Sequence, residues 1–67
     1  MTFGKKIETY RLKHNLTQGE LGERVGLSTM MISYLERELK KPTFEIAIRL
    51  AKELDISLDY LADDNKV

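Results

Sequence analysis

The fold of this chain is decided by residues 17–36, which read TQGELGERVGLSTMMISYLE. The stretch opens with a capping box, because Glu20 follows Thr17 by three residues. Gly26 suits the left-handed position that ends a helix, and Ser28 suits the cap that begins the next one. A short connection that contains glycine forces two successive helices to cross steeply. The stretch therefore predicts a helix-turn-helix over residues 17–36.

The spacing of small and apolar residues supports this prediction. Gly22 stands where the two helix axes would approach each other, and a small residue is needed there. The alternative is a generic corner between two helices of another kind of helical domain. Such a corner needs fewer glycine and apolar residues at fixed positions than this stretch contains. The apolar residues placed to pack the joint are Leu21, Val25, Leu27, Ile32 and Leu35.

Apolar residues at helical spacing predict three further helices, over about residues 3–14, 43–55 and 57–61. With the central pair they make an all-α fold of five short helices, and residues 1–67 are predicted to form this single domain. We expect the tail, residues 63–67, to be frayed. The apolar stripes of the first and fourth helices are Phe3, Ile7 and Tyr10, and Phe44, Ala47, Leu50, Ala51 and Leu54.

The composition excludes several classes of protein. A chain of 67 residues allows one small domain, and the absence of Cys leaves no disulfide or thiolate metal site. A single His argues against a zinc site, so we expect no metal and no cofactor. No apolar stretch approaches the ~20 residues of a membrane span, and no signal peptide is recognisable. No convergent set of catalytic side chains stands out, so we expect no enzyme activity.

The net charge is zero, with 11 Lys and Arg against 11 Asp and Glu, which argues against a nucleic-acid partner. The charges are unevenly distributed, however. Residues 1–15 carry 4 cations and 1 anion (+3), residues 16–41 carry 4 of each, and residues 42–67 carry 3 cations and 6 anions (−3). Such asymmetry can orient a molecule toward a polyanion, although ordinary solvated helix faces produce the same pattern.

The helix-turn-helix and its flanking residues resemble the phage repressor/Cro-type family of helix-turn-helix regulators, also called XRE-like. The resemblance covers about residues 3–62 and implies a lambda-repressor-like DNA-binding domain. It also implies that the third helix enters the DNA major groove and that a homodimer binds a two-fold symmetric operator. The matching residues are Leu16, Thr17, Gln18, Glu20, Leu21, Ile32, Ser33, Pro42, Thr43, Leu50, Ala51 and Leu54, with residues 25–28, 35–37 and 56–58.

By position, the resemblance implies which residues contact DNA. Gln18 corresponds to a residue that caps the DNA-facing end of the second helix and contacts a phosphate or a base edge. Lys5 and Lys6, near the start of the first helix, are further phosphate candidates. The other predicted contact residues, on the third helix and in the loop after it, are Ser28, Thr29, Met30, Ser33, Tyr34, Arg37, Lys40 and Lys41.

The chemistry of the third helix supports part of this assignment. The hydroxyls of Thr29, Ser33 and Tyr34 can hydrogen-bond bases or phosphates, and Met30 can pack against a thymine methyl. The face lacks Arg, Asn and Gln, which read guanine and adenine bidentately, so we expect modest direct readout helped by Gln18 and DNA shape. The alternative for Met30 and Tyr34 is an ordinary core or surface role.

The resemblance also concerns residues outside the contact surface. Arg11 and Glu36 resemble a pair that forms a buried salt bridge between the first and third helices. Glu38 stands where Gly is usual, which either alters the loop after the third helix or extends that helix. Asp55 likewise stands where Gly is common, and Asp tolerates left-handed geometry. The candidate dimer contacts are Ile46, Leu58, Tyr60 and Leu61.

The sequence therefore predicts a sequence-specific DNA-binding transcriptional regulator, a repressor of bacterial or phage origin that works in the cytoplasm at the nucleoid. Its partners would be an operator in double-stranded DNA and a second copy of the chain, with no membrane and no small-molecule ligand. A protein-interaction or antitoxin-type module on the same scaffold is the alternative, since a fold does not fix a function. The cations Arg37, Lys40 and Lys41 around the helix-turn-helix favour DNA.

Overall fold

The computed structural model describes residues 1–63 and, over these residues, contains five helices and no strand. The helices are α1 (Phe3–Lys13), α2 (Gln18–Val25), α3 (Thr29–Glu36), α4 (Phe44–Leu54) and α5 (Leu58–Ala62). The predicted all-α fold with a helix-turn-helix is confirmed. Most of the tail that we expected to be frayed, residues 64–67, lies outside the described residues. No helix within residues 1–63 combines the length and the apolar character needed to cross a bilayer.

Each helix begins at a hydroxyl cap that accepts a hydrogen bond from the backbone N–H three residues later. At Thr17 the predicted capping box is complete, because the Glu20 carboxylate accepts from the Thr17 N–H at 2.8 Å. The hydrogen bonds from Thr17 lower the pKa of Glu20. The Glu20 carboxylate therefore contributes to the stability of the fold at pH values above the ordinary pKa of a carboxyl group. This contribution is lost as the pH falls through the lowered pKa of Glu20. The caps are Thr2, Thr17, Ser28, Thr43 and Ser57.

The ends of α1 to α4 share one motif, a residue of positive φ followed by an apolar residue whose N–H binds the carbonyl five residues earlier. Asn15, Gly26 and Asp55 all tolerate the left-handed conformation. Glu38 adopts it too, with φ 62°, so α3 ends at Glu36 and is not extended into the loop. The apolar residues that follow are Leu16, Leu27, Leu39 and Ile56.

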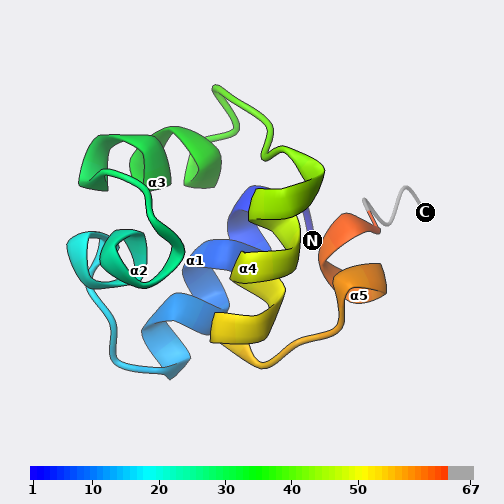
Figure 1. The fold of residues 1–67 in the computed structure, drawn as a ribbon. Coiled ribbons are helices and arrows are strands. Elements are labelled where there is room, and N and C mark those ends of the chain that lie inside the picture. The colour runs from blue at the N-terminus through cyan, green and yellow to red at the C-terminus, as the bar shows by residue number, and fades with distance from the viewer. Residues whose placement is uncertain (64–67) are drawn as a thin grey trace.

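In the packing, α1 and α4 form the centre of the molecule. The α2–α3 pair lies at one end and α5 at the other (Figure 1). Gly22 permits the steep crossing of α2 and α3, because a Cβ atom there would collide with the carbonyl oxygen of Leu27. The buried apolar side chains that form the core are Ile7, Leu16, Leu21, Val25, Ile32, Leu35, Leu50, Ala51, Leu54 and Leu61.

Two sequence expectations about apolar residues are corrected. Phe44, which shares the helical spacing of the α4 stripe, is 73% exposed, because the first residue of α4 precedes the part of the helix that meets the core. Leu61, a candidate dimer contact, is 1% exposed and belongs to the core, so its side chain is unavailable at the surface.

Lys6 also differs from expectation, since this candidate for phosphate contact is 2% exposed. Its ammonium donates to the backbone carbonyl of Tyr60 at 2.5 Å and to that of Asp63. It also lies 4.3 Å from the centroid of the Tyr60 ring. A cation at the C-terminal carbonyls of a helix is favourable, so Lys6 holds α5 against α1 and its ammonium is not available to a phosphate.

We expect Lys6→Met to lower the melting temperature while leaving the helical fold intact. The substitution keeps an apolar stem of similar length but removes the ammonium from the α5 carbonyls, at a cost of about 1–3 kcal/mol. Thermal denaturation followed by circular dichroism measures the change. The matched control is Lys5→Met, because the Lys5 side chain is 66% exposed and forms only a surface ion pair with Glu8. Equal melting temperatures for the two variants would contradict this role.

Candidate nucleic-acid interface

The helix α3 divides into a core face and an outer face. Ile32 and Leu35 are 0% and 1% exposed and fix the inner side of the helix. On the outer side, Met30 is 61% exposed, although it is apolar. The other predicted contact residues are either exposed (Ser28, Thr29, Arg37, Lys40 and Lys41) or half-buried (Gln18, Ser33 and Tyr34). The structure therefore brings the predicted α3 residues together on one accessible face.

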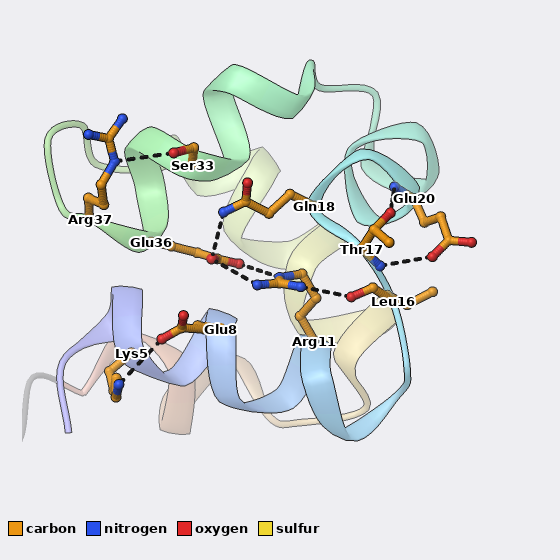
Figure 2. A network of polar contacts seen from close by, with 10 residues as sticks. All are labelled: Lys5, Glu8, Arg11, Leu16, Thr17, Gln18, Glu20, Ser33, Glu36 and Arg37. Atoms are coloured by element: carbon orange, nitrogen blue, oxygen red, sulfur yellow. Dashed lines mark hydrogen bonds and ion pairs between the residues drawn. The ribbon is translucent and has the colours of Figure 1, made fainter.

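Several polar groups on this face are held in place by neighbouring residues. The Ser33 hydroxyl accepts a hydrogen bond from Arg37 Nε at 3.2 Å, as Figure 2 shows. The guanidinium carbon of Arg37 also lies 5.6 Å from the centroid of the Tyr34 ring. Ser28 Oγ accepts from the Met31 N–H at 3.0 Å, which leaves the hydroxyl proton free to donate outward. Arg37 is thus positioned at the end of α3 without a carboxylate partner in residues 1–63.

A buried ion pair beneath the outer face connects α1, α2 and α3. Arg11 Nε donates to Glu36 Oε2 at 2.6 Å, and the side chains are 9% and 5% exposed. Arg11 Nη1 also donates to the carbonyl of Leu16 at 2.8 Å, and Gln18 Nε2 donates to Glu36 Oε1 at 3.0 Å (Figure 2). Within the described chain, no buried polar side-chain atom lacks a partner. Only one N–H of the Gln18 amide is engaged with Glu36, so the second N–H and the carbonyl oxygen remain for an external ligand.

The free cations lie close to α3 in the chain. Lys40 and Lys41 are exposed in the loop after α3, and neither has an ion-pair or hydrogen-bond partner within residues 1–63. Lys5 is exposed near the start of α1 and pairs with Glu8 at 3.3 Å. Asp59 on α5 and Asp63 at its end lie at the opposite end of the molecule from α2 and α3 (Figure 1), whereas Glu53 of α4 pairs with Arg24 of α2. The predicted charge asymmetry is therefore only partly reproduced in space, because residues 16–41, which contain α2 and α3, carry four cations and four anions.

The candidate dimer residues form a less exposed set. Ile46 and Leu58 are half-buried against the core, and Tyr60 is 38% exposed. The Tyr60 ring also meets the Tyr10 ring edge to face, with 5.9 Å between the centroids. Tyr60 is therefore the member of this set with the largest accessible surface.

Sequence reasoning missed two contacts that shape the interface. Arg49 Nη1, on α4, donates to the carbonyl of Val25 at 3.3 Å. This hydrogen bond ties α4 to the end of α2, where the connection to α3 begins. Glu38 Oε2 accepts from the backbone N–H of Gly4 at 3.3 Å, which joins the end of α3 to the start of α1. The first contact has no local sequence signal. The second has one, because a glycine in the first turn of a helix indicates close approach of another backbone.

No group of three or more His, Asp or Glu side chains within residues 1–63 is arranged to hold a metal ion. The polar groups of the outer face are hydroxyls and cations, which suit hydrogen bonding to base edges and phosphates. The fold and this face together define a helix-turn-helix domain.

Comparisons with known proteins agree with this class. A family model described as "Helix-turn-helix" matches residues 7–61. The repressor protein C2 of Salmonella phage P22 is 40% identical over 58 residues, covering 87% of this chain and 27% of that protein. An HTH-type transcriptional regulator of Methanocaldococcus jannaschii, MJ0272, is 32% identical over 63 residues, covering 91% of this chain and 96% of that protein. The chain thus spans about a quarter of the phage repressor and nearly all of the archaeal relative.

Solved structures show the same likeness. The P22 c2 repressor in complex with a synthetic operator has a TM-score of 0.91 and 35% identity, covering 97% of this chain and 98% of that one. SinR of Bacillus subtilis in complex with DNA has a TM-score of 0.84 and 28% identity, covering 92% and 100%. The chain belongs to the XRE-type helix-turn-helix family of transcriptional regulators.

We expect Arg11→Ala to reduce the free energy of unfolding by ~3–5 kcal/mol, because it leaves the buried Glu36 carboxylate without its cation. Urea denaturation with the tryptophan-free chain is followed by circular dichroism. Arg24→Ala is the matched control: Arg24 pairs with Glu53 at 3.6 Å, but the two side chains are 56% and 36% exposed. That exposed pair contributes roughly 0–1 kcal/mol. If the unfolding curves of Arg11→Ala and Arg24→Ala coincide, the buried ion pair contributes no more to the free energy of unfolding than the exposed one.

Proposed function

We propose that the chain binds specific sites in double-stranded DNA as a transcriptional repressor, with α3 in the major groove. The observation that carries this proposal is the outer face of α3, where an exposed Met30 lies among hydroxyl side chains. The cations Arg37, Lys40 and Lys41 follow this helix in the chain and are exposed. The P22 relative is named a repressor, and the P22 c2 and SinR structures contain operator or other DNA. The proposal extends this behaviour to the present chain.

The dimensions of α3 suit the major groove. The groove of B-DNA is about 12 Å wide and admits one α-helix. The eight residues of α3 span roughly 12 Å along the helix axis, which limits direct contact to a few base pairs. Phosphate contacts would come from both sides of the groove, with Gln18 at the start of α2 and Lys40 and Lys41 after α3. Lys5 is a further candidate because it is exposed on α1.

Sequence readout by this face would be modest. The hydroxyls of Thr29 and Ser33 can bond to more than one base, and Met30 suits the methyl group of thymine. Arg37, the cation nearest to α3, follows the last helical residue and suits a phosphate better than a base edge. With a net charge of zero, non-specific attraction to DNA is also weak. Specificity therefore depends on DNA shape and on the simultaneous binding of two copies.

A homodimer on a two-fold symmetric operator meets this requirement. Two copies would place their α3 helices about 34 Å apart, one turn of B-DNA. Tyr60, together with the half-buried Ile46 and Leu58, is the proposed contact between the copies. Occupancy of an operator at the nucleoid would block polymerase without any catalytic step.

The direct test begins with selection of bound duplexes from a random DNA library by the purified 67-residue chain. The selected duplex and a scrambled duplex are then titrated by fluorescence anisotropy at several salt concentrations. We expect the chain to prefer the selected duplex to the scrambled one. We also expect the logarithm of the binding constant to fall linearly with the logarithm of the salt concentration, with a slope of ~0.9 per neutralised phosphate. Binding that is absent, or insensitive to both salt and sequence, would overturn the proposal and favour a protein-interaction module.

The role of Met30 can be tested on both sides of the contact. Because Met30 is 61% exposed, Met30→Ala should leave the melting temperature unchanged. We expect it to weaken binding to the selected duplex about fourfold, the effect of roughly one buried methylene. Replacing the contacted thymine by deoxyuridine removes only the methyl group and should weaken the wild-type chain similarly. The Met30→Ala variant is then titrated with the deoxyuridine duplex. If the two losses of affinity simply add, Met30 and the thymine methyl group are not in contact.

A further inference from the structure

The end of α3 departs from the ends of α1, α2 and α4 in two respects. Its left-handed residue is Glu38, whose side chain disfavours this backbone conformation more than Asn, Gly or Asp does. The apolar residue that follows, Leu39, is 62% exposed, whereas its counterparts in the other three helix ends are buried or half-buried. The apolar contact that commonly stabilises this motif is therefore missing. The backbone hydrogen bond of the motif remains, from the Leu39 N–H to the Tyr34 carbonyl at 2.9 Å, and a side-chain interaction adds to it.

The Gly4–Glu38 contact is that interaction. Glu38 Oε2 accepts a hydrogen bond from the Gly4 N–H at 3.3 Å, across 34 residues of sequence. Gly4 lies in the first turn of α1, where backbone N–H groups have no partner within the helix. The positive end of the α1 dipole also favours a carboxylate. The side chain of Glu38 thus compensates for the backbone conformation that it disfavours.

The environment of Gly4 supports this explanation independently. A Cβ atom on Gly4 would lie 2.5 Å from the carbonyl oxygen of Glu36 and 2.7 Å from Cγ of Glu38. The start of α1 can therefore approach the end of α3 only because residue 4 has no side chain. Glu38 has no ion-pair partner within residues 1–63, so its carboxylate is not held by a cation instead.

We propose that Glu38 is a positioning residue for DNA binding, which anchors the loop of residues 37–43 to α1 and so presets Lys40 and Lys41 beside α3. The inference rests on the DNA-binding function proposed above. Lys40 and Lys41 follow Glu38 closely, are exposed, and have no partner of their own within residues 1–63. A loop that is ordered before binding loses less conformational entropy when its side chains meet phosphates. The negative charge of Glu38 itself repels phosphate. Positioning by Glu38 therefore raises the affinity for DNA, whereas its charge lowers it.

Two substitutions separate these effects. Glu38→Gln removes the charge but keeps a carbonyl acceptor for the Gly4 N–H, whereas Glu38→Gly removes the acceptor and relieves the backbone conformation. Each variant is titrated with the library-selected duplex at two salt concentrations, and its melting curve is recorded. We expect Glu38→Gly to melt near wild type yet to bind roughly three- to tenfold more weakly, with a shallower salt dependence. Glu38→Gln should bind at least as tightly as wild type.

A double-mutant cycle tests whether the effect passes through the lysines. In the Glu38→Gly background, the combined change Lys40→Gln and Lys41→Gln should cost less affinity than it does in the wild-type chain. Without DNA, hydrogen exchange of the Gly4 amide should accelerate in Glu38→Gly and remain slow in Glu38→Gln.

Four results would overturn the proposal. Equal tightening of binding in both Glu38 variants would show that Glu38 acts only through its charge. A loss of affinity in Glu38→Gly that matches its loss of folded protein would show a role in stability alone. Unchanged binding by Glu38→Gly, with wild type bound normally, would remove the role of Glu38 while leaving the proposed function intact. If wild type binds no duplex, the proposed function fails first and this inference fails with it.

Discussion

The buried ion pair between Arg11 and Glu36 is the interaction on which the rest of the structure depends. Arg11 donates to Glu36 and to the carbonyl of Leu16, and Glu36 also accepts from Gln18, so one cluster reaches α1, α2, α3 and the first connection. A buried pair adds little net stability compared with an apolar core, but a partner left alone is costly. Its main effect is therefore geometric, because it permits one orientation of α3 on α1.

That orientation also explains how a chain of zero net charge can suit a polyanion. The ion pair neutralises Arg11 and Glu36 inside the molecule, so neither contributes to the surface. Lys6 is likewise taken up by the carbonyls at the end of α5. Arg37, Lys40 and Lys41, at and after the end of α3, have no carboxylate partner within residues 1–63, and α5 with Asp59 lies at the other end of the molecule (Figure 1). Placement of charge, and not its total, determines which face is compatible with DNA.

The sequence predicted those features of the fold that local chemistry determines. The cap at Thr17 and the left-handed Gly26 depend on residues within one helical turn, so the boundaries of the helix-turn-helix followed from spacing alone. The burial of Lys6 could not be predicted, because its partners lie 54 and 57 residues away. Phe44 matched the periodicity of α4 but lies beyond the core. The partner of Glu38 lies 34 residues away, and only the glycine at residue 4 hinted at it.

The two faces of α3 have a consequence for how this domain diverges. Ile32 and Leu35 on the inner face bear the packing, whereas Thr29 and Met30 on the outer face are exposed. Substitutions at exposed positions generally change stability by less than about 0.5 kcal/mol, so they leave a small stability margin almost intact. Substitutions can therefore accumulate on the outer face of α3 without loss of the fold. Relatives only 27–40% identical share this architecture. This divergence is expected when core packing constrains only the inner face of α3 and leaves the outer face free to vary.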